Sequence, residues 1–117
     1  MIIKRKGNQT KIKSPSCGDL LEIVKTKDFG IVRAENIGIT GRHYHRKLTE
    51  VSHLLSGEIE VEVGKKGGKV ETVVLKSGDV LVLQPFDIHK IVKASKNNKM
   101  LVTCVPDWSE EDEINVE

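Results

Sequence analysis

Histidines are concentrated in one short segment of the chain. Residues 41–58 read GRHYHRKLTEVSHLLSGE and hold three of the four histidines. Because side chains alternate between the two faces of a strand, His43 and His45 face the same way if this segment is extended. Two neighbouring imidazoles on one face can bind a single metal ion at about 2.0–2.1 Å. The pair therefore indicates metal-ion chemistry.

Glu50 is the carboxylate nearest to this pair. It lies five residues after His45, so on a continuous strand it would face away from the histidines. We therefore predict that RKLT forms a turn and that Glu50 lies on the next, antiparallel strand, where pairing brings its carboxylate to the same side. Ser52 and Leu54 share the predicted face of Glu50. His53 falls on the other face and is excluded as a ligand.

The fourth histidine, His89, lies far along the chain. It follows SGDVLVLQPFDI, in which Pro85 and Asp87 mark a turn, and it is predicted to open the next strand. Three imidazoles and one carboxylate suit Mn, Fe, Ni, Cu, Co or Zn rather than Ca or Mg. Four protein ligands can leave one or two octahedral positions open, as a catalytic metal requires. The predicted metal ligands are His43, His45, Glu50 and His89.

The elements that must position these residues are predicted to be short strands. Turn signals such as NIGITG, SGE, GKKGGK, KSGD and QPFD recur along the chain, with apolar or alternating runs between them. In EIEVEV, the residues Ile59, Val61 and Val63 share one face, which predicts a half-buried strand. VLVLQ is apolar throughout and predicts a strand covered on both faces. The pattern favours an all-β sandwich or barrel.

The last residues, DWSEEDEINVE, carry an acidic run. Ser109 and Asp112 have the spacing of a helix capping box, with acids in the first turn, so we predict a short terminal helix or a frayed tail. The acidic side chains are expected to be solvated. Trp108, the single tryptophan, is expected to anchor this segment on the barrel.

Size and composition narrow the class of protein. The chain has 117 residues, the size of one domain, and a net charge of +2, which does not indicate a nucleic-acid partner. No apolar run approaches the roughly 20 residues of a membrane span. The start, MIIKRKGN, becomes polar too early for a signal peptide, so a cytoplasmic location is expected. Cys17 and Cys104 are expected to be reduced thiols there, with a bridge between them as the alternative.

At these residues the chain resembles the cupin superfamily. The first motif of that family is a Gly, HxH, three or four residues, a Glu, six residues and a Gly. His43, His45, Glu50 and Gly57 follow this spacing, and Gly38 precedes the pair by one residue fewer than usual.

The second cupin motif is a Gly, a short strand, Pro-x-Gly, two residues, a His and often a following Asn. Gly78, Pro85 and His89 match it, with one residue more than usual between the first two. Asp87 replaces the Gly of Pro-x-Gly, and Lys93 stands where the Asn is expected. These departures spare all the positions that bind metal in the family.

The resemblance covers roughly residues 18–106 and implies a single-domain cupin jelly-roll β-barrel of about eight strands. Residues 1–17 are then an N-terminal arm or edge strand, and residues 107–117 are an acidic C-terminal segment. The resemblance also implies a homodimer formed by edge-strand exchange near the N-terminus, which covers an exposed sheet edge.

The motifs do not define the reaction, because cupins include dioxygenases, sugar isomerases, epimerases, decarboxylases, lyases and non-catalytic binding proteins. We predict a mononuclear metal site that acts on a small oxygen-rich or anionic molecule by isomerase, lyase or dioxygenase chemistry, with Glu50 also able to serve as a catalytic base. A module that binds a small ligand or a metal without catalysis is the alternative. Arg42, Arg46 and Lys47 either reach the mouth of the barrel, which would favour an anionic substrate, or form surface charge.

Overall fold

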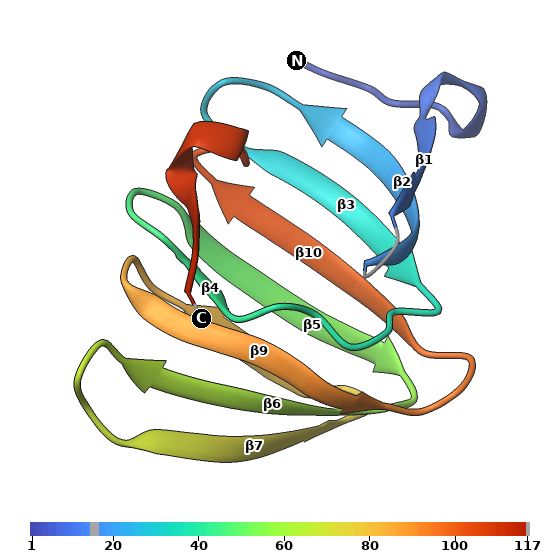
Figure 1. Cartoon of the computed structure of the whole chain (residues 1–117). Coiled ribbons are helices and arrows are strands. Elements are labelled where there is room, and N and C mark those ends of the chain that lie inside the picture. Colours follow the sequence, from blue (N-terminus) through green and yellow to red (C-terminus); the bar gives the residue numbers. More distant parts are fainter. Residues whose placement is uncertain (15–16, 117) are drawn as a thin grey trace.

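Two antiparallel β-sheets pack face to face in the computed structural model, which describes residues 1–14 and 17–116 (Figure 1). The six-stranded sheet has the order β1 (Thr10–Ser14), β2 (Gly18–Lys25), β3 (Gly30–Glu35), β10 (Lys99–Val105), β5 (Thr49–Ser56) and β8 (Val80–Leu83). The five-stranded sheet has the order β11 (Glu113–Asn115), β4 (His43–His45), β9 (Asp87–Ala94), β6 (Glu58–Lys65) and β7 (Val70–Lys76). The helical elements of the described residues are two short 3-10 helices, η1 (Lys6–Asn8) and η2 (Glu110–Asp112), and neither has the length that crossing a membrane requires. The all-β jelly-roll prediction is confirmed.

The apolar core lies between the sheets and fills one end of the barrel. Alternate residues of EIEVEV are buried as predicted, and Ile59 of β6 shares one cluster with Leu54 of β5 and Met100 of β10. Burial of each such side chain contributes about 1.5–3 kcal/mol. Toward the other end of β5, the residues on the face of Leu54 are the polar Ser52, which is buried, and Glu50. The apolar filling thus gives way to polar side chains along the barrel.

The run VLVLQ forms β8, and the prediction that both of its faces are covered is wrong. Val80 and Val82 are 52% and 50% exposed, whereas Leu83 is buried. β8 pairs with β5 alone and forms one edge of the six-stranded sheet. In the described part of the chain, no further layer packs on the outer face of this sheet at β8, so Val80 and Val82 stay exposed.

The C-terminal segment ends as a strand, not as a capped helix. η2 is three residues long, and Ser109 makes no side-chain hydrogen bond at its start, so the prediction of a capping box is wrong. The chain then forms β11, which pairs with β4. Ile114 and Val116 alternate with polar residues, which suits a strand, and the segment is too short for a stable helix. The short C-terminal tail predicted as the other possibility is present.

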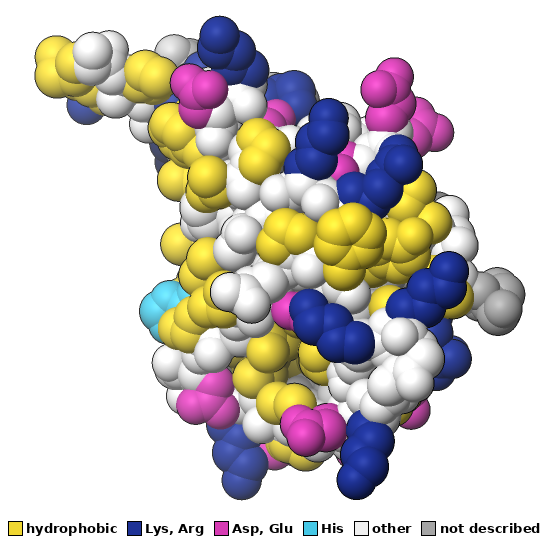
Figure 2. Space-filling model, turned by 90° about the vertical axis from the view of Figure 1, so that its left-hand side faces the viewer, with side chains coloured by type: hydrophobic (Ala, Val, Ile, Leu, Met, Phe, Trp, Pro, Cys, Tyr) yellow, Lys and Arg dark blue, Asp and Glu magenta, His cyan; other side chains and the backbone are white. Residues whose placement is uncertain are grey.

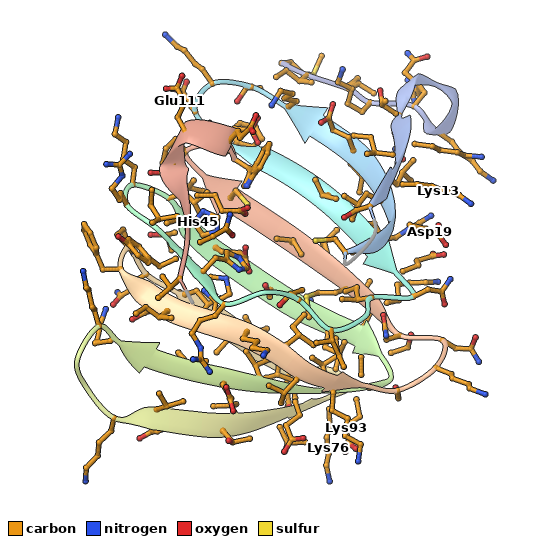
Figure 3. All side chains as sticks on the ribbon, viewed as in Figure 1. Lys13, Asp19, His45, Lys76, Lys93 and Glu111 are labelled. Atoms are coloured by element: carbon orange, nitrogen blue, oxygen red, sulfur yellow. The ribbon has the colours of Figure 1, made fainter. Side chains whose placement is uncertain are left out.

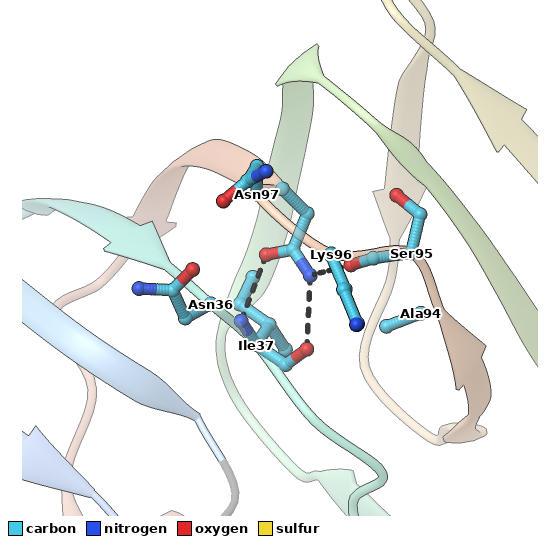
Figure 4. A pocket seen from close by; sticks show the side chains of 7 residues that line it. Asn36, Ile37, Ala94, Ser95, Lys96 and Asn97 are labelled. Carbon is cyan, nitrogen blue, oxygen red and sulfur yellow. Dashed lines mark hydrogen bonds between the residues drawn. The ribbon is translucent and has the colours of Figure 1, made fainter.

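A polar pocket at the turn between β9 and β10 is lined in part by a buried asparagine (Figure 4). The side chain of Asn98 accepts a hydrogen bond from the N–H of Ile37 at 2.8 Å and donates to the carbonyls of Ile37 and Ser95, both at 2.9 Å. These bonds tie the turn to the segment after β3. The residues that line this pocket include no His, Asp or Glu, so we assign it to the architecture of the turn.

Several large apolar side chains stay exposed. Figure 2 shows hydrophobic side chains gathered in one area, with Lys and Arg side chains around them, and a narrow extension that also carries hydrophobic groups. Ile2 and Ile3 in the N-terminal segment are 56% and 55% exposed, and Ile12 of β1 is 43% exposed. Exposed apolar groups on an edge strand are a feature of contact surfaces.

Candidate metal centre

Three histidines from two neighbouring strands meet on the inner face of the five-stranded sheet. His43 and His45 lie on β4, and His89 lies on β9 directly opposite His43. One ring nitrogen from each lies within 4.8 Å of the others. His45 and His89 are 4% and 6% exposed, and Figure 3 shows His45 close to the C-terminal segment. The structure thus brings together the three histidines that the sequence singled out.

Backbone carbonyls orient two of the rings. Nδ1 of His43 lies 3.0 Å from the carbonyl oxygen of Gly41, and Nδ1 of His89 lies 3.0 Å from that of Asp87. Because a carbonyl oxygen only accepts hydrogen bonds, each Nδ1 carries a proton, and in the neutral ring Nε2 keeps its lone pair. Proteins commonly hold metal-binding imidazoles in one tautomer and one orientation in this way.

The buried rings are in the form that binds metal. Burial lowers the pKa of His45 and the pKa of His89, and the negative charge of Glu50 partly opposes this effect. Both rings are therefore neutral at neutral pH, as ligation requires. Nδ1 of His45 is buried without a hydrogen-bond partner in the described part of the chain, which is costly unless another group satisfies it. By their chemistry, the three rings fit a divalent transition metal ion.

Glu50 approaches the histidines from the opposite sheet. Its strand, β5, pairs with β10 and β8, so the prediction that Glu50 lies on the strand paired with the HxH strand is wrong. The segment RKLT connects the strands as predicted, but it crosses between the sheets, and the packing of the two sheets brings their inner faces together. The hydroxyl of Ser52 donates to Oε2 of Glu50 at 3.0 Å. The carboxylate lies outside the group of three histidines, and so does His53.

Cys104 is the neighbour of Glu50 on β10 and lies directly opposite it. It is a buried free thiol, so the structure contains no bridge to Cys17. Burial raises the pKa of Cys104 to about 12, and the charge of Glu50 adds to this. The thiol stays protonated at neutral pH and is a small apolar neighbour of Glu50, not a thiolate ligand.

The turn before β9 positions His89 and is tied to β4. Asp87, which replaces the Gly of the cupin motif, closes the turn by accepting a hydrogen bond from the N–H of Gln84 at 2.7 Å. The N–H of Phe86 donates to the carbonyl of His45 at 2.8 Å. The ring of Phe86 stacks on Tyr44, with the ring centres 5.7 Å apart. The turn that contains a glycine in the cupin motif is thus shaped here by the hydrogen bond of Asp87 and the ring contact of Phe86.

Two of the three basic residues near the HxH strand have partners on the protein. Arg42 forms an ion pair of 2.8 Å with a glutamate of β6. Arg46 donates to a backbone carbonyl of η2 at 3.1 Å, and Lys47 is exposed. Lys93, at the position of the usual Asn, points away from the barrel (Figure 3). These contacts favour structural and surface roles for the four side chains.

Asp112 is a buried carboxylate, 7% exposed, so the predictions that it completes a capping box and that it is solvated are wrong. Its Oδ1 accepts hydrogen bonds from the N–H groups of Arg46 at 3.1 Å and Lys47 at 2.8 Å, and its Oδ2 accepts one from Leu48 at 3.2 Å. These donors form the turn that follows His45. The local spacing from Ser109 pointed to a helix cap, whereas the partners of Asp112 lie 64 to 66 residues earlier.

Glu113, the next residue, was also missed. It lies on β11 opposite His45, and its Oε1 is 3.9 Å from Nε2 of His43. The acidic run was expected to be solvated, and for Glu113 this expectation is wrong because β11 adds to the sheet beside β4. The alternation of Ile114 and Val116 was the one signal of a strand here.

The profile of the cupin domain family matches residues 31–106, which is more than half of the chain. The chain belongs to the cupin family. The match includes the histidines and Glu50, and it ends before the C-terminal segment of this cupin. None of the curated proteins matches this cupin in sequence.

Solved structures similar to this cupin share its fold at low sequence identity. Pac13, described as a unique nucleoside dehydratase, is 16% identical with a TM-score of 0.76, and the match covers 100% of this chain and 92% of that chain. A Streptomyces Pac13 variant solved with uridine is 16% identical with a TM-score of 0.78, over 100% of this chain and 92% of that one. A variant of oxalate decarboxylase from Bacillus subtilis is 16% identical with a TM-score of 0.76, over 94% of this chain and 31% of that chain.

Proposed function

We propose that this cupin binds one divalent transition metal ion, either Mn, Fe, Ni, Cu, Co or Zn, through His43, His45, His89 and Glu50. The observation that carries the proposal is the meeting of three imidazoles within 4.8 Å. Burial keeps two of them neutral, and backbone carbonyls orient two. Glu50 lies on the opposite sheet, and its charge acts on both buried histidines, which supports it as the fourth ligand.

We further propose that the substrate is a small oxygen-rich or anionic molecule and that the reaction is of isomerase, lyase or dioxygenase type. When bound, such a metal ion polarises oxygen atoms of a substrate as a Lewis acid. Glu50 is the proposed base: the hydroxyl of Ser52 orients one of its oxygens, and the apolar thiol of Cys104 lies opposite it. Two structural neighbours support this substrate class, because one was solved with uridine and the other is named for oxalate. Uridine and oxalate each carry several oxygen atoms.

Metal analysis followed by a ligand screen tests this proposal. The metal-free protein is loaded with Mn²⁺, Zn²⁺ or, without oxygen, Fe²⁺, and unbound metal is removed. We expect it to retain about one ion per chain, because the described residues form one cluster of three ligands. Failure to retain any of these ions contradicts the proposal.

Uridine and oxalate are then offered to the loaded protein, with products followed by NMR and oxygen uptake by an electrode. Turnover with oxygen uptake assigns a dioxygenase, and turnover without it assigns an isomerase or lyase. Reversible binding without turnover contradicts the catalytic part of the proposal and assigns a binding module.

We also propose that this cupin is a homodimer that pairs through β1. This strand bonds to β2 alone, so the backbone groups on its outer side are open to a second chain. The exposed Ile12, with Ile2 and Ile3 before it, supplies apolar contacts at the same edge. These features support pairing of edge strands between two copies.

Substitution of Ile12 by lysine is expected to convert the dimer to a monomer. It removes the apolar side chain of β1 and places a third positive charge between Lys11 and Lys13, so that like charges oppose strand pairing. Size-exclusion chromatography with light scattering measures the mass. Val70→Lys is the matched control, since Val70 is 59% exposed on β7 at the edge of the other sheet. It is expected to stay dimeric. A monomeric wild-type protein rules out the dimer.

A further inference from the structure

The C-terminal strand adds a carboxylate to the face that carries the histidines. β11 pairs with β4 so that Glu113 lies opposite His45 and Asn115 lies opposite His43. Residues directly opposite each other in an antiparallel pair point to the same face of the sheet. Glu113 therefore projects toward the histidine cluster. It does so from a segment beyond residue 106, where the match to the family profile ends.

The distance between Glu113 and His43 suits two ligands of one ion. Oε1 of Glu113 lies 3.9 Å from Nε2 of His43, which is too long for a hydrogen bond. Nε2 is also the nitrogen that keeps its lone pair, because Nδ1 bonds to the carbonyl of Gly41. Two atoms that each bind the same ion at about 2.1 Å lie at most about 4.2 Å apart. One ion therefore fits between the two side chains. Like Glu50, Glu113 lies outside the group of three histidines, so its carboxylate has to turn toward His45 and His89 when it shares their ion.

Trp108 holds this carboxylate in place. Its indole N–H donates to the same oxygen, Oε1 of Glu113, at 3.1 Å, and an indole nitrogen can only donate. Outer hydrogen bonds of this kind fix the direction of a ligating carboxylate. In Figure 1, η2 and β11 lead from the end of β10 to the side of β4. The segment that anchors Glu113 is thus continuous with the sheet that contains the histidines.

A second carboxylate would also balance the charge of the site. Three neutral imidazoles leave the charge of a divalent ion uncompensated, and Glu50 supplies one negative charge from the six-stranded sheet. We propose that Glu113 is a further ligand of the metal, so that the C-terminal strand completes the centre. This inference rests on the proposed function, since it requires that the histidines bind a metal ion.

Isothermal titration calorimetry of the metal-free protein with Co²⁺ tests the inference. Glu113→Gln is expected to raise the dissociation constant for Co²⁺ about 10- to 100-fold. The amide keeps an oxygen that can accept the Trp108 bond, so the fold is preserved, and the unfolding temperature without metal verifies this. Glu111→Gln is the matched control from the same acidic segment, because Glu111 is exposed on the outside of η2 (Figure 3). It is expected to bind Co²⁺ as the wild type does.

His43→Ala separates failure of this inference from failure of the proposed function. If His43→Ala weakens Co²⁺ binding and Glu113→Gln does not, Glu113 is not a ligand and the histidine site stands. If His43→Ala also binds as the wild type does, the proposed function itself is overturned. Should Glu113→Gln unfold more easily without metal, Trp108→Phe decides: weaker Co²⁺ binding supports the inference, and unchanged binding overturns it.

Discussion

Replacement of His45 by alanine is expected to lower the metal content of the purified protein by about tenfold or more. His45 is the most buried of the three imidazoles, and its ring centre lies 5.3 Å from that of His43 and 5.7 Å from that of His89. Without His45, His43 on β4 and His89 on β9 are the two imidazoles left to bind the ion. Inductively coupled plasma mass spectrometry of the dialysed protein measures the loss, and the unfolding temperature without metal verifies that the variant is folded.

His53→Ala is the matched control for His45→Ala. His53 lies on β5 opposite Val80 and Leu101, and it is outside the histidine group. Ser52 and Leu54 on either side of it are 3% and 0% exposed, so the inner face of β5 belongs to them. The metal content of His53→Ala is therefore expected to equal that of the wild type. Equal losses in the two variants would refute the assignment of faces.

The local part of the site is predictable from the sequence because it depends on strand periodicity. A spacing of two residues puts His43 and His45 on one face, and the same rule separates His53 from Glu50. His89 is accessible to this reasoning because Pro85 and Asp87 mark a turn, and β9 does begin at Asp87. These predictions need no knowledge of which strands are neighbours.

The rest of the site depends on strand pairing, which local patterns do not contain. Periodicity correctly requires a turn between His45 and Glu50, but it does not tell a hairpin from a crossing between sheets. Asp112 and Glu113 belong to an acidic run that resembles a solvated helix start. Their partners are the β4 strand and the turn after it, which lie far earlier in the chain. The wrong prediction for β8 has the same cause. Its apolar run does not reveal that the strand lies at the edge of a sheet.

Asp112→Ala is expected to lower the free energy of unfolding of the metal-free protein by about 3 kcal/mol. The carboxylate is 7% exposed and accepts three backbone N–H groups of the turn after His45. Alanine leaves those donors without an acceptor, and the N–H of Leu48 is buried, so water does not replace the lost bond there. Urea unfolding followed by circular dichroism measures the change.

Asp112→Asn and Glu110→Ala set the scale for this loss. The amide of asparagine keeps one oxygen for the turn but presents an N–H₂ group to a backbone N–H, so a loss of about 1 kcal/mol is expected. Glu110 is exposed in the same 3-10 helix, and its replacement is expected to leave stability unchanged. Because the turn follows His45 directly, Asp112→Ala also loosens one end of β4. The affinity of the Asp112→Ala protein for Co²⁺ is therefore expected to fall. The affinity of the Glu110→Ala protein is expected to stay unchanged. An Asp112→Ala protein as stable as Glu110→Ala would show that the turn holds its shape without the carboxylate.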